Sequence, residues 1–309
     1  MRKTAFIFPG QGSQYVGMGK DFYENFACSR EMIDLAEKVS GMDMKTLLFE
    51  ENEQLNITKY TQIAMLADEL AILRAVQEKG FRSSVNAGLS LGEYAALVAS
   101  GVMTAEDAFR VIVKRGAYMQ EAVPTGGAMT AVMGMDNDVI EKICSETDGI
   151  VSVANYNCPG QTVITGEETA VAAAAASLKE AGAKRCVPLN VSGPFHSDML
   201  REAGVKLAKE LESVEIHEIA TPYITNVTAD YVTDKDQVKD LLERQISSSV
   251  RWQQSVERMI ADGVEVFIEI GPKKSLTGFL KKIDKSVPVY HVDTVADLDV
   301  LCESIGTAE

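Results

Sequence analysis

A serine framed by two glycines is the clearest candidate for chemistry in this sequence. Ser90 lies between Gly88 and Gly92 in a Gly-x-Ser-x-Gly pattern, directly before a short apolar segment. This pattern is typical of a sharp strand-to-helix turn, in which the glycines tolerate the strained backbone and the close packing. Free N–H groups at the helix N-terminus can stabilise a developing oxyanion. We therefore expect Ser90 to be a nucleophile; the alternative is an ordinary glycine turn before a helix.

A serine nucleophile needs a base, and the sequence contains three histidines. His217 has the alternation of a solvent-facing strand residue, and His291 lies in a predicted edge or late strand over 288–292. His196 follows a Gly-Pro pair in a loop, and loops carry catalytic groups more often than other segments do. We therefore expect His196 to be the general base; the alternative is a loop histidine without a catalytic role.

Arg115 falls on the apolar face of a predicted helix that Thr104 can cap, with Asp107 three residues later. The apolar positions of this helix recur at helical spacing: Ala108, Val111, Ile112, Tyr118, Met119 and Ala122. A guanidinium on a buried face needs a partner, because burying it unpaired costs several kcal/mol. Two partners stay open here: an Asp or Glu of the protein, or a substrate carboxylate held by a bidentate clamp.

The composition limits the class of protein. The 309 residues are 46% hydrophobic and 24% charged, which is typical of a globular chain with one large domain or two unequal ones. A net charge of −15 argues against nucleic acid as a partner. The apolar runs are too short for a membrane span or a signal peptide, so we expect a cytoplasmic protein. Five cysteines without C-x-x-C spacing predict reduced, mostly buried thiols, and we expect neither a metal nor a cofactor.

Basic residues are concentrated in one segment near the end of the chain. Four of them recur at helical spacing after Gly271-Pro272, so several would share one face: Lys274, Lys281, Lys282 and Lys285, with Lys273 adjacent. Such a face is either a docking site for an acidic partner or a solvated surface near a helix C-terminus.

Strand and helix patterns alternate along the chain, which indicates an α/β protein. We expect a strand over 4–8, a helix over 61–79, and a strand over 264–270 with one polar side. Residues 128–190 have the βαββαβ order of an inserted ferredoxin-like subdomain. The expected elements of this insert are strands 128–134, 150–154, 162–165 and 183–189 and helices 138–146 and 168–181. The larger domain is then discontinuous, built from 1–127 and 191–309.

Taken together, these residues resemble the malonyl-CoA:acyl carrier protein transacylases of fatty acid synthesis, nearly from end to end. The matching motifs are Phe8-Pro9-Gly10-Gln11-Gly12-Ser13-Gln14, Thr61-Gln62, Gly88–Val98, Arg115-Gly116, Asn155-Tyr156-Asn157, Gly193-Pro194-Phe195-His196, Arg244-Gln245 and Glu269-Ile270-Gly271-Pro272. The resemblance implies an α/β-hydrolase-like core with a ferredoxin-like insert, in agreement with the inserted unit above.

The resemblance also implies a role for each matching catalytic residue. Ser90 would be the nucleophile, His196 would deprotonate it, and the main-chain carbonyl of Gln245 would orient the imidazole. The backbone N–H groups of Gln11 and Leu91 would form the oxyanion hole.

The implied substrate site contains Arg115, which would bind the free carboxylate of a malonyl group, together with Gln11, Asn155 and Phe195. We expect Phe195 to narrow the pocket against an α-methyl substituent. Two positions depart from the family: Leu89 stands where histidine is common, and Lys273 where a glycine often follows Gly-Pro.

The activity implied is transfer of malonyl from malonyl-CoA to the phosphopantetheine thiol of acyl carrier protein, through a malonyl-serine intermediate with ping-pong kinetics. Acyl carrier protein is acidic, so the lysine-rich segment is its expected docking face. Three alternatives stay open: a serine hydrolase or thioesterase, a non-catalytic carrier-binding protein, and a polyketide acyltransferase acting in trans.

Overall fold

The computed structural model describes residues 2–306 and contains ten strands in two sheets. The strands are β1 (Thr4–Phe8), β2 (Val85–Gly88), β3 (Gly127–Met133), β4 (Val151–Cys158), β5 (Gln161–Glu167), β6 (Arg185–Pro188), β7 (Tyr223–Ile224), β8 (Tyr231–Val232), β9 (Val266–Ile270) and β10 (Val289–Val292). The larger sheet has the order β10-β9-β1-β2-β7-β8 and is parallel except for the β7–β8 pair. The smaller sheet has the order β4-β5-β3-β6 and is antiparallel.

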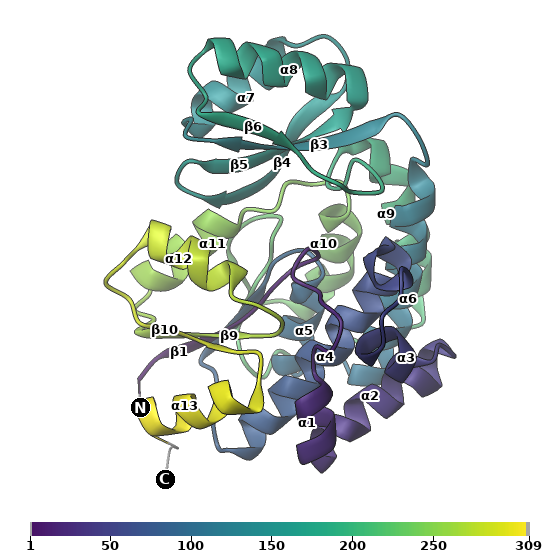
Figure 1. The fold of residues 1–309 in the computed structure, drawn as a ribbon, viewed down its shortest axis with the longest axis vertical. Coiled ribbons are helices and arrows are strands. Elements are labelled where there is room, and N and C mark those ends of the chain that lie inside the picture. The colour runs from purple at the N-terminus through teal and green to yellow at the C-terminus, as the bar shows by residue number, and fades with distance from the viewer. Residues whose placement is uncertain (1, 307–309) are drawn as a thin grey trace.

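Helices surround both sheets (Figure 1). They are α1 (Lys20–Asn25), α2 (Ala27–Ser40), α3 (Met44–Phe49), α4 (Thr58–Glu78), α5 (Gly92–Ala99), α6 (Ala105–Ala122), α7 (Asn137–Glu146), α8 (Glu168–Glu180), α9 (Arg201–Glu212), α10 (Val238–Gln245), α11 (Trp252–Ala261), α12 (Ser275–Ile283) and α13 (Val295–Ile305). None of the helices in residues 2–306 has the length and apolar character needed to cross a membrane.

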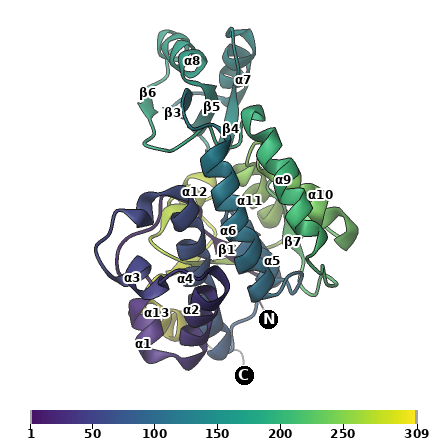
Figure 2. The same ribbon diagram turned by 90° about the vertical axis from the view of Figure 1, so that its right-hand side faces the viewer.

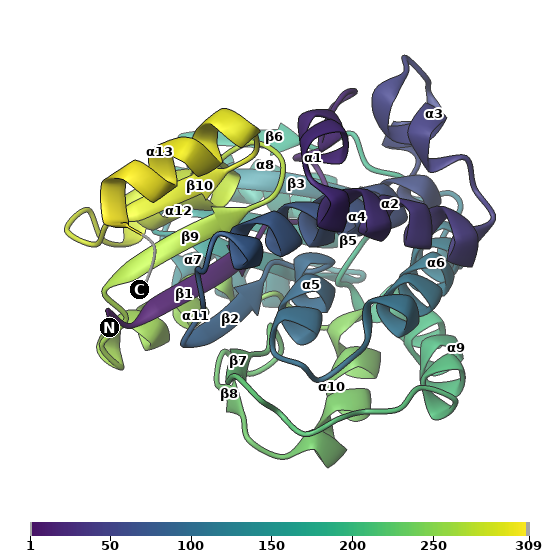
Figure 3. The same ribbon diagram turned by 90° about the horizontal axis from the view of Figure 1, so that it is seen from below.

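The larger sheet has a hydrophobic core on each face, because successive strand residues point to opposite sides. In β1, Phe6 and Phe8 join one core cluster, whereas Ala5 and Ile7 join the other. Figure 3 shows β10, β9, β1 and β2 side by side across the molecule. Phe8 pairs with Gly88, so the loops after β1 and β2 leave the same edge of the sheet as neighbours. Ligands bind at this kind of edge in open parallel sheets.

The predicted insert forms the smaller sheet. Its element order β3-α7-β4-β5-α8-β6, paired as β4-β5-β3-β6, is the ferredoxin-like topology. Helices α7 and α8 lie together on one side of this sheet, above the larger domain in Figure 1. The α/β fold with a ferredoxin-like insert is therefore confirmed. The domain limits at 127/128 and 190/191 stay a prediction.

Strand β4 connects the small sheet to the larger domain through Val250, in the loop between α10 and α11. The Tyr156 N–H donates to the Val250 carbonyl at 2.9 Å, and the Val250 N–H donates to the Ala154 carbonyl at 2.7 Å. Figure 2 shows α6 running from the larger domain toward the small sheet. Asn155 and Asn157 of β4 line a common cavity with the loops that follow β1 and β2, so this edge of the small sheet lies close to them.

The polar side predicted for 264–270 is wrong at Glu269, whereas Glu265, just before β9, is exposed. Every residue of β9 is buried, and Glu269 is 0% exposed. A strand inside a parallel sheet is covered on both faces, so a charged side chain there needs an internal partner. Glu269 finds it at the start of α12, where it accepts the N–H of Leu276 at 2.9 Å and of Thr277 at 2.7 Å.

The strand predicted around His217 does not form either. Its N–H donates to the Val102 carbonyl at 2.9 Å, in the connection between α5 and α6, so the backbone is tied to a loop instead of a strand. His291 lies in β10, the edge strand of the larger sheet, as predicted. The thiols are free as expected, but only Cys144 and Cys158 are buried.

Candidate active site

Ser90 occupies a strained turn between β2 and α5. Its φ is +56°, a conformation that costs energy for a residue with a side chain. Both flanking glycines are sterically required, because a Cβ on Gly88 would lie 1.9 Å from the Gly92 carbonyl carbon. A Cβ on Gly92 would lie 2.3 Å from the Phe8 carbonyl oxygen. The turn therefore fits tightly against β1 and projects the serine hydroxyl from the sheet edge.

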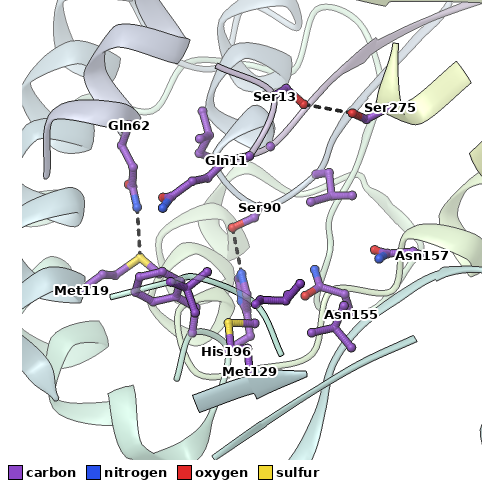
Figure 4. Close-up of a pocket in the computed structure, with 18 of the residues that line it drawn as sticks. Gln11, Ser13, Gln62, Ser90, Met119, Met129, Asn155, Asn157, His196 and Ser275 are labelled. Atoms are coloured by element: carbon purple, nitrogen blue, oxygen red, sulfur yellow. Dashed lines mark hydrogen bonds between the residues drawn. The ribbon is translucent and has the colours of Figure 1, made fainter. Parts of the chain in front are cut away.

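His196 meets this hydroxyl. Its Nε2 lies 2.8 Å from Ser90 Oγ (Figure 4). Its Nδ1 lies 2.9 Å from the main-chain oxygen of Gln245 and 3.2 Å from that of Ser248. Carbonyl oxygens only accept hydrogen bonds, so Nδ1 carries the proton and Nε2 keeps a lone pair toward the serine. The neutral imidazole is thus in the tautomer that can take a proton from Ser90.

Burial keeps this imidazole neutral. His196 is 4% exposed, and desolvation together with the positive charge of Arg115 lowers its pKa to about 4. The two carbonyl oxygens at Nδ1 oppose this shift, but they are outweighed. At neutral pH the histidine is therefore an unprotonated base.

Arg115 is fully buried on α6, as the helical spacing predicted, and Thr104 caps that helix. Its guanidinium donates to Gln62 Oε1 at 2.8 Å, to Ser90 Oγ at 3.1 Å and to Gln245 Oε1 at 3.1 Å. All three acceptors are neutral, so within residues 2–306 these contacts provide no carboxylate for the guanidinium. A fully desolvated cation with only neutral acceptors is a strong receptor for an anionic ligand.

A cavity of about 290 Å³ opens onto these groups. Figure 4 shows Gln11 and Asn155 on opposite sides of Ser90. The other predicted substrate residues, Arg115 and Phe195, line the same cavity, as does Leu89. The structure therefore brings every predicted substrate residue to one site.

Two backbone donors also face this cavity. Gln11 follows β1, Leu91 follows Ser90, and both residues line the cavity. Among the hydrogen bonds of residues 2–306, neither N–H has a backbone or side-chain acceptor. A Cβ on Gly10 would lie 2.7 Å from the Leu89 carbonyl oxygen, so glycine is needed for the two turns to approach this closely.

Comparison with known proteins assigns this arrangement to a family. A family model described as an acyl transferase domain matches residues 5–303. Malonyl CoA-acyl carrier protein transacylases from Bacillus subtilis (strain 168) and Haemophilus influenzae are each 41% identical, over 99% and 98% of this chain and 98% and 99% of those proteins. The crystal structure of MCAT from Streptococcus pneumoniae has a TM-score of 0.95 at 47% identity, covering 98% of this chain and 100% of that one.

The chain belongs to the malonyl CoA-acyl carrier protein transacylase family. A further solved structure of this transacylase family is a type II PKS acyl-carrier protein in complex with its malonyl-transacylase. It has a TM-score of 0.94 at 41% identity and covers 97% of this chain and 99% of that one.

Two residues of this transacylase that support the nucleophile, Asn226 and Glu93, were not among the predicted site residues. Asn226 follows β7 and brackets the Ser90 turn: its Oδ1 accepts the Ser90 N–H at 2.7 Å, and its Nδ2 donates to the Gly88 carbonyl at 2.6 Å. Glu93 is 0% exposed and accepts from Gln245 and from the Asn226 backbone. Its pKa is raised to about 7 by burial, against the opposing effect of these hydrogen bonds. Glu93 could have been noticed from the sequence, because it is an acidic residue in the first turn of the helix that follows Ser90. No sequence pattern indicated Asn226.

The basic segment differs from a single helical face. Helix α12 contains only Lys281 and Lys282, whereas Lys273 and Lys274 precede it and Lys285 follows it. All five side chains are exposed. The prediction from helical spacing that these lysines share one face is therefore wrong. The turn after Gly271-Pro272 continues to Lys274, and the helix begins only at Ser275.

Proposed function

We propose that this transacylase moves a malonyl group from malonyl-CoA to the phosphopantetheine thiol of an acyl carrier protein, with Ser90 as the covalent carrier. One observation carries the proposal: the Ser90 hydroxyl lies 2.8 Å from a neutral imidazole and 3.1 Å from a buried guanidinium. The first group supplies a base, and the second supplies a receptor for a carboxylate on the acyl group.

In the first half-reaction His196 Nε2 takes the Ser90 proton while Oγ attacks the thioester carbonyl carbon. The carbonyl oxygen becomes an oxyanion that accepts hydrogen bonds from the N–H groups of Gln11 and Leu91. Losing one such donor would raise the barrier by about 2.7–4 kcal/mol. The C–S bond then breaks, and His196 returns the proton to the leaving CoA sulfur. The product is malonyl-Ser90 with a neutral histidine.

The second half-reaction repeats these steps with a new nucleophile. His196 takes the proton of the phosphopantetheine thiol, the sulfur attacks the ester carbonyl, and the same N–H groups hold the oxyanion. The C–O bond to Ser90 breaks and His196 returns the proton to Oγ. Throughout both steps the main-chain oxygen of Gln245 holds the protonated Nδ1, so the imidazole keeps its orientation.

Arg115 supplies the selectivity. A malonyl carboxylate can accept two hydrogen bonds from the guanidinium, whereas an acetyl group leaves a buried cation with neutral acceptors only. Gln11, Asn155 and Phe195 also line the cavity and would surround the acyl group. We expect the Phe195 ring to disfavour an α-methyl substituent.

The carrier docks, in this proposal, on the exposed lysines at 273, 274, 281, 282 and 285. Acyl carrier proteins are acidic, and a chain with net charge −15 needs a local basic surface to attract one. Ser275, next to Lys274, lines the active-site cavity, so this surface adjoins the cavity. The cytoplasmic location remains a prediction from the sequence.

A polyketide carrier is the second candidate acceptor, because one solved relative is a complex of a type II PKS acyl-carrier protein with its malonyl-transacylase. The chemistry at Ser90 is the same for both carriers. A hydrolase would use the same serine and histidine but would have no need for a buried, unpaired guanidinium. A non-catalytic carrier-binding protein would need none of the three groups.

The test is discharge of the isolated acyl-enzyme. The chain is mixed briefly with malonyl-CoA, freed of small molecules, and given holo acyl carrier protein or buffer alone. We expect malonyl to move to the carrier and to remain on the enzyme in buffer. Rapid release of free malonate in both samples would instead identify a hydrolase.

A further inference from the structure

A buried carboxylate close to the nucleophile takes no part in the mechanism above. Glu93 lies in the first turn of α5 and is 0% exposed. Its Oε2 accepts the Gln245 side-chain N–H at 2.6 Å and the Asn226 backbone N–H at 3.0 Å. Asn226 and Gln245 each form a hydrogen bond with the Ser90 backbone. Glu93 therefore contacts two residues that hold the nucleophile in place.

The side chain of Gln245 links Glu93 to Arg115. Its Nε2 donates to Glu93 and, at 3.0 Å, to the Ser90 carbonyl, while its Oε1 accepts from Arg115 at 3.1 Å. Above its pKa of about 7, Glu93 is ionised and only accepts hydrogen bonds, whereas a guanidinium only donates them. One orientation of the Gln245 amide then satisfies both neighbours. The inverted amide would turn an N–H toward Arg115 and an oxygen toward Glu93, in a site where water cannot compensate.

We propose that Glu93 is a positioning residue: it fixes the Gln245 amide so that the amide oxygen faces Arg115 and holds the guanidinium ready for a carboxylate-bearing acyl group. Because Glu93 acts through a neutral amide, it supports the cation without forming the ion pair that would occupy it. The inference rests on the proposed function, since it assigns a purpose to the same guanidinium.

The test replaces Glu93 by its isosteric amide. Glu93→Gln replaces an acceptor-only group by an amide that can also donate. Of the two acceptors that hold the Gln245 Nε2, only the Ser90 carbonyl is then fixed, so the amide oxygen is held less firmly toward Arg115. Adduct formation on Ser90 is measured against malonyl-CoA concentration, and Ser90 is separately sulfonylated with phenylmethylsulfonyl fluoride, a neutral reagent that needs no guanidinium. We expect the half-saturating malonyl-CoA concentration to rise about tenfold or more, and sulfonylation to stay within about threefold.

The matched control is Asp68→Asn, which also turns a fully buried carboxyl group into an amide but lies outside the cavity lining. It should leave both reactions unchanged. If Glu93→Gln does not fold, Gln245→Met removes the amide but keeps the main-chain carbonyl, and should give the same rise in half-saturating concentration.

Two results would overturn the inference alone: an unchanged half-saturating concentration, or an equal fall in malonylation and sulfonylation, which would mean that Glu93 only holds the serine turn. Absence of a malonyl adduct on the unaltered chain would overturn the proposed function, and this inference with it.

Discussion

At the scale of single residues, the decisive property is the protonation state of His196. Desolvation and the charge of Arg115 lower its pKa to about 4, so the base is available throughout the neutral range. Protonation would fill the Nε2 lone pair and block proton transfer from Ser90. Acidity therefore acts on acylation only well below the range in which an exposed histidine titrates.

The first prediction follows from this pKa. The second-order rate of malonyl-Ser90 formation should be nearly constant from about pH 8 to about pH 5, then fall about tenfold per unit below about pH 4. Rapid-quench measurements after a brief pH jump avoid loss by acid unfolding. A break near the ordinary histidine pKa of about 6.5 would contradict the assignment of a desolvated base.

The second prediction concerns Arg115. Arg115→Ala should slow malonyl transfer about a hundredfold or more, because a buried charge pair loses one partner. Acetyl-CoA should become a better substrate relative to malonyl-CoA, since the desolvated cation that rejects it is gone. Competition between the two thioesters, read by intact-protein mass, gives the ratio directly. An unchanged acyl preference would exclude Arg115 as the carboxylate receptor.

At the scale of elements, the β2–Ser90–α5 turn depends on its contact with β1. Gly92→Ala should destabilise the protein by about 1–3 kcal/mol and reduce acylation, because the new Cβ meets fixed backbone at Phe8. Gly278→Ala is the matched control: it is also helical, and its Cβ would meet nothing within 4 Å. It should stabilise by about 0.5–1 kcal/mol without changing activity. Urea unfolding of both variants tests this, and equal effects would argue against steric necessity.

Helix α12 provides the test of carrier docking. Reversing the charges of Lys281 and Lys282 to Glu should slow malonyl transfer to the carrier and leave acylation by malonyl-CoA intact. The same double reversal at Lys206 and Lys209, both exposed on α9, controls for net charge. Half-reaction rates at low ionic strength separate the two steps. Equal slowing by both double variants would show that the effect is not local to α12.

At the scale of the whole molecule, stability depends on carboxylates buried away from the active site. Asp68 is 0% exposed, and neither oxygen has a hydrogen-bond partner within residues 2–306. Burial raises its pKa well above the usual range, with the charges of Asp293 and Asp21 adding to the shift. The folded protein therefore holds a proton that the unfolded chain releases above about pH 4.

The contribution of Asp68 to the free energy of unfolding decreases as the pH rises. The stability contributed by protonated Asp68 is complete below about pH 4 and is lost as the pH rises toward the folded-state pKa. Asp68→Asn does not titrate, so its stability advantage should grow with pH, to about 1 kcal/mol or more at pH 8 relative to pH 5. Asp299→Asn, an exposed position, should show no such trend. A pH-independent difference in urea unfolding would mean that Asp68 is ionised in the folded state.

The sequence was most informative where one local pattern determines the structure. Gly88 and Gly92 predicted the turn at Ser90, and the apolar spacing around Arg115 predicted its burial. The βαββαβ order predicted the small sheet, because such a unit has few ways to pair its strands.

The sequence was least informative where partners come from distant segments. Asn226 binds the Ser90 N–H from 136 residues away, and the partners of Glu93 are Asn226 and Gln245. The N–H partners of Glu269 are near in sequence, but its burial depends on the strands on both sides of β9. Their side chains alone suggest solvent exposure. The folded structure shows that all three side chains are buried and form internal hydrogen bonds.

The most direct test of the account is to locate the acyl group after one turnover. The chain is mixed with malonyl-CoA for a fraction of a second, quenched in acid and digested, and its peptides are measured by mass. We predict a malonyl ester on Ser90 and none in a Ser90→Ala variant. Malonyl on another residue, or free malonate formed without any ester on Ser90, would contradict it.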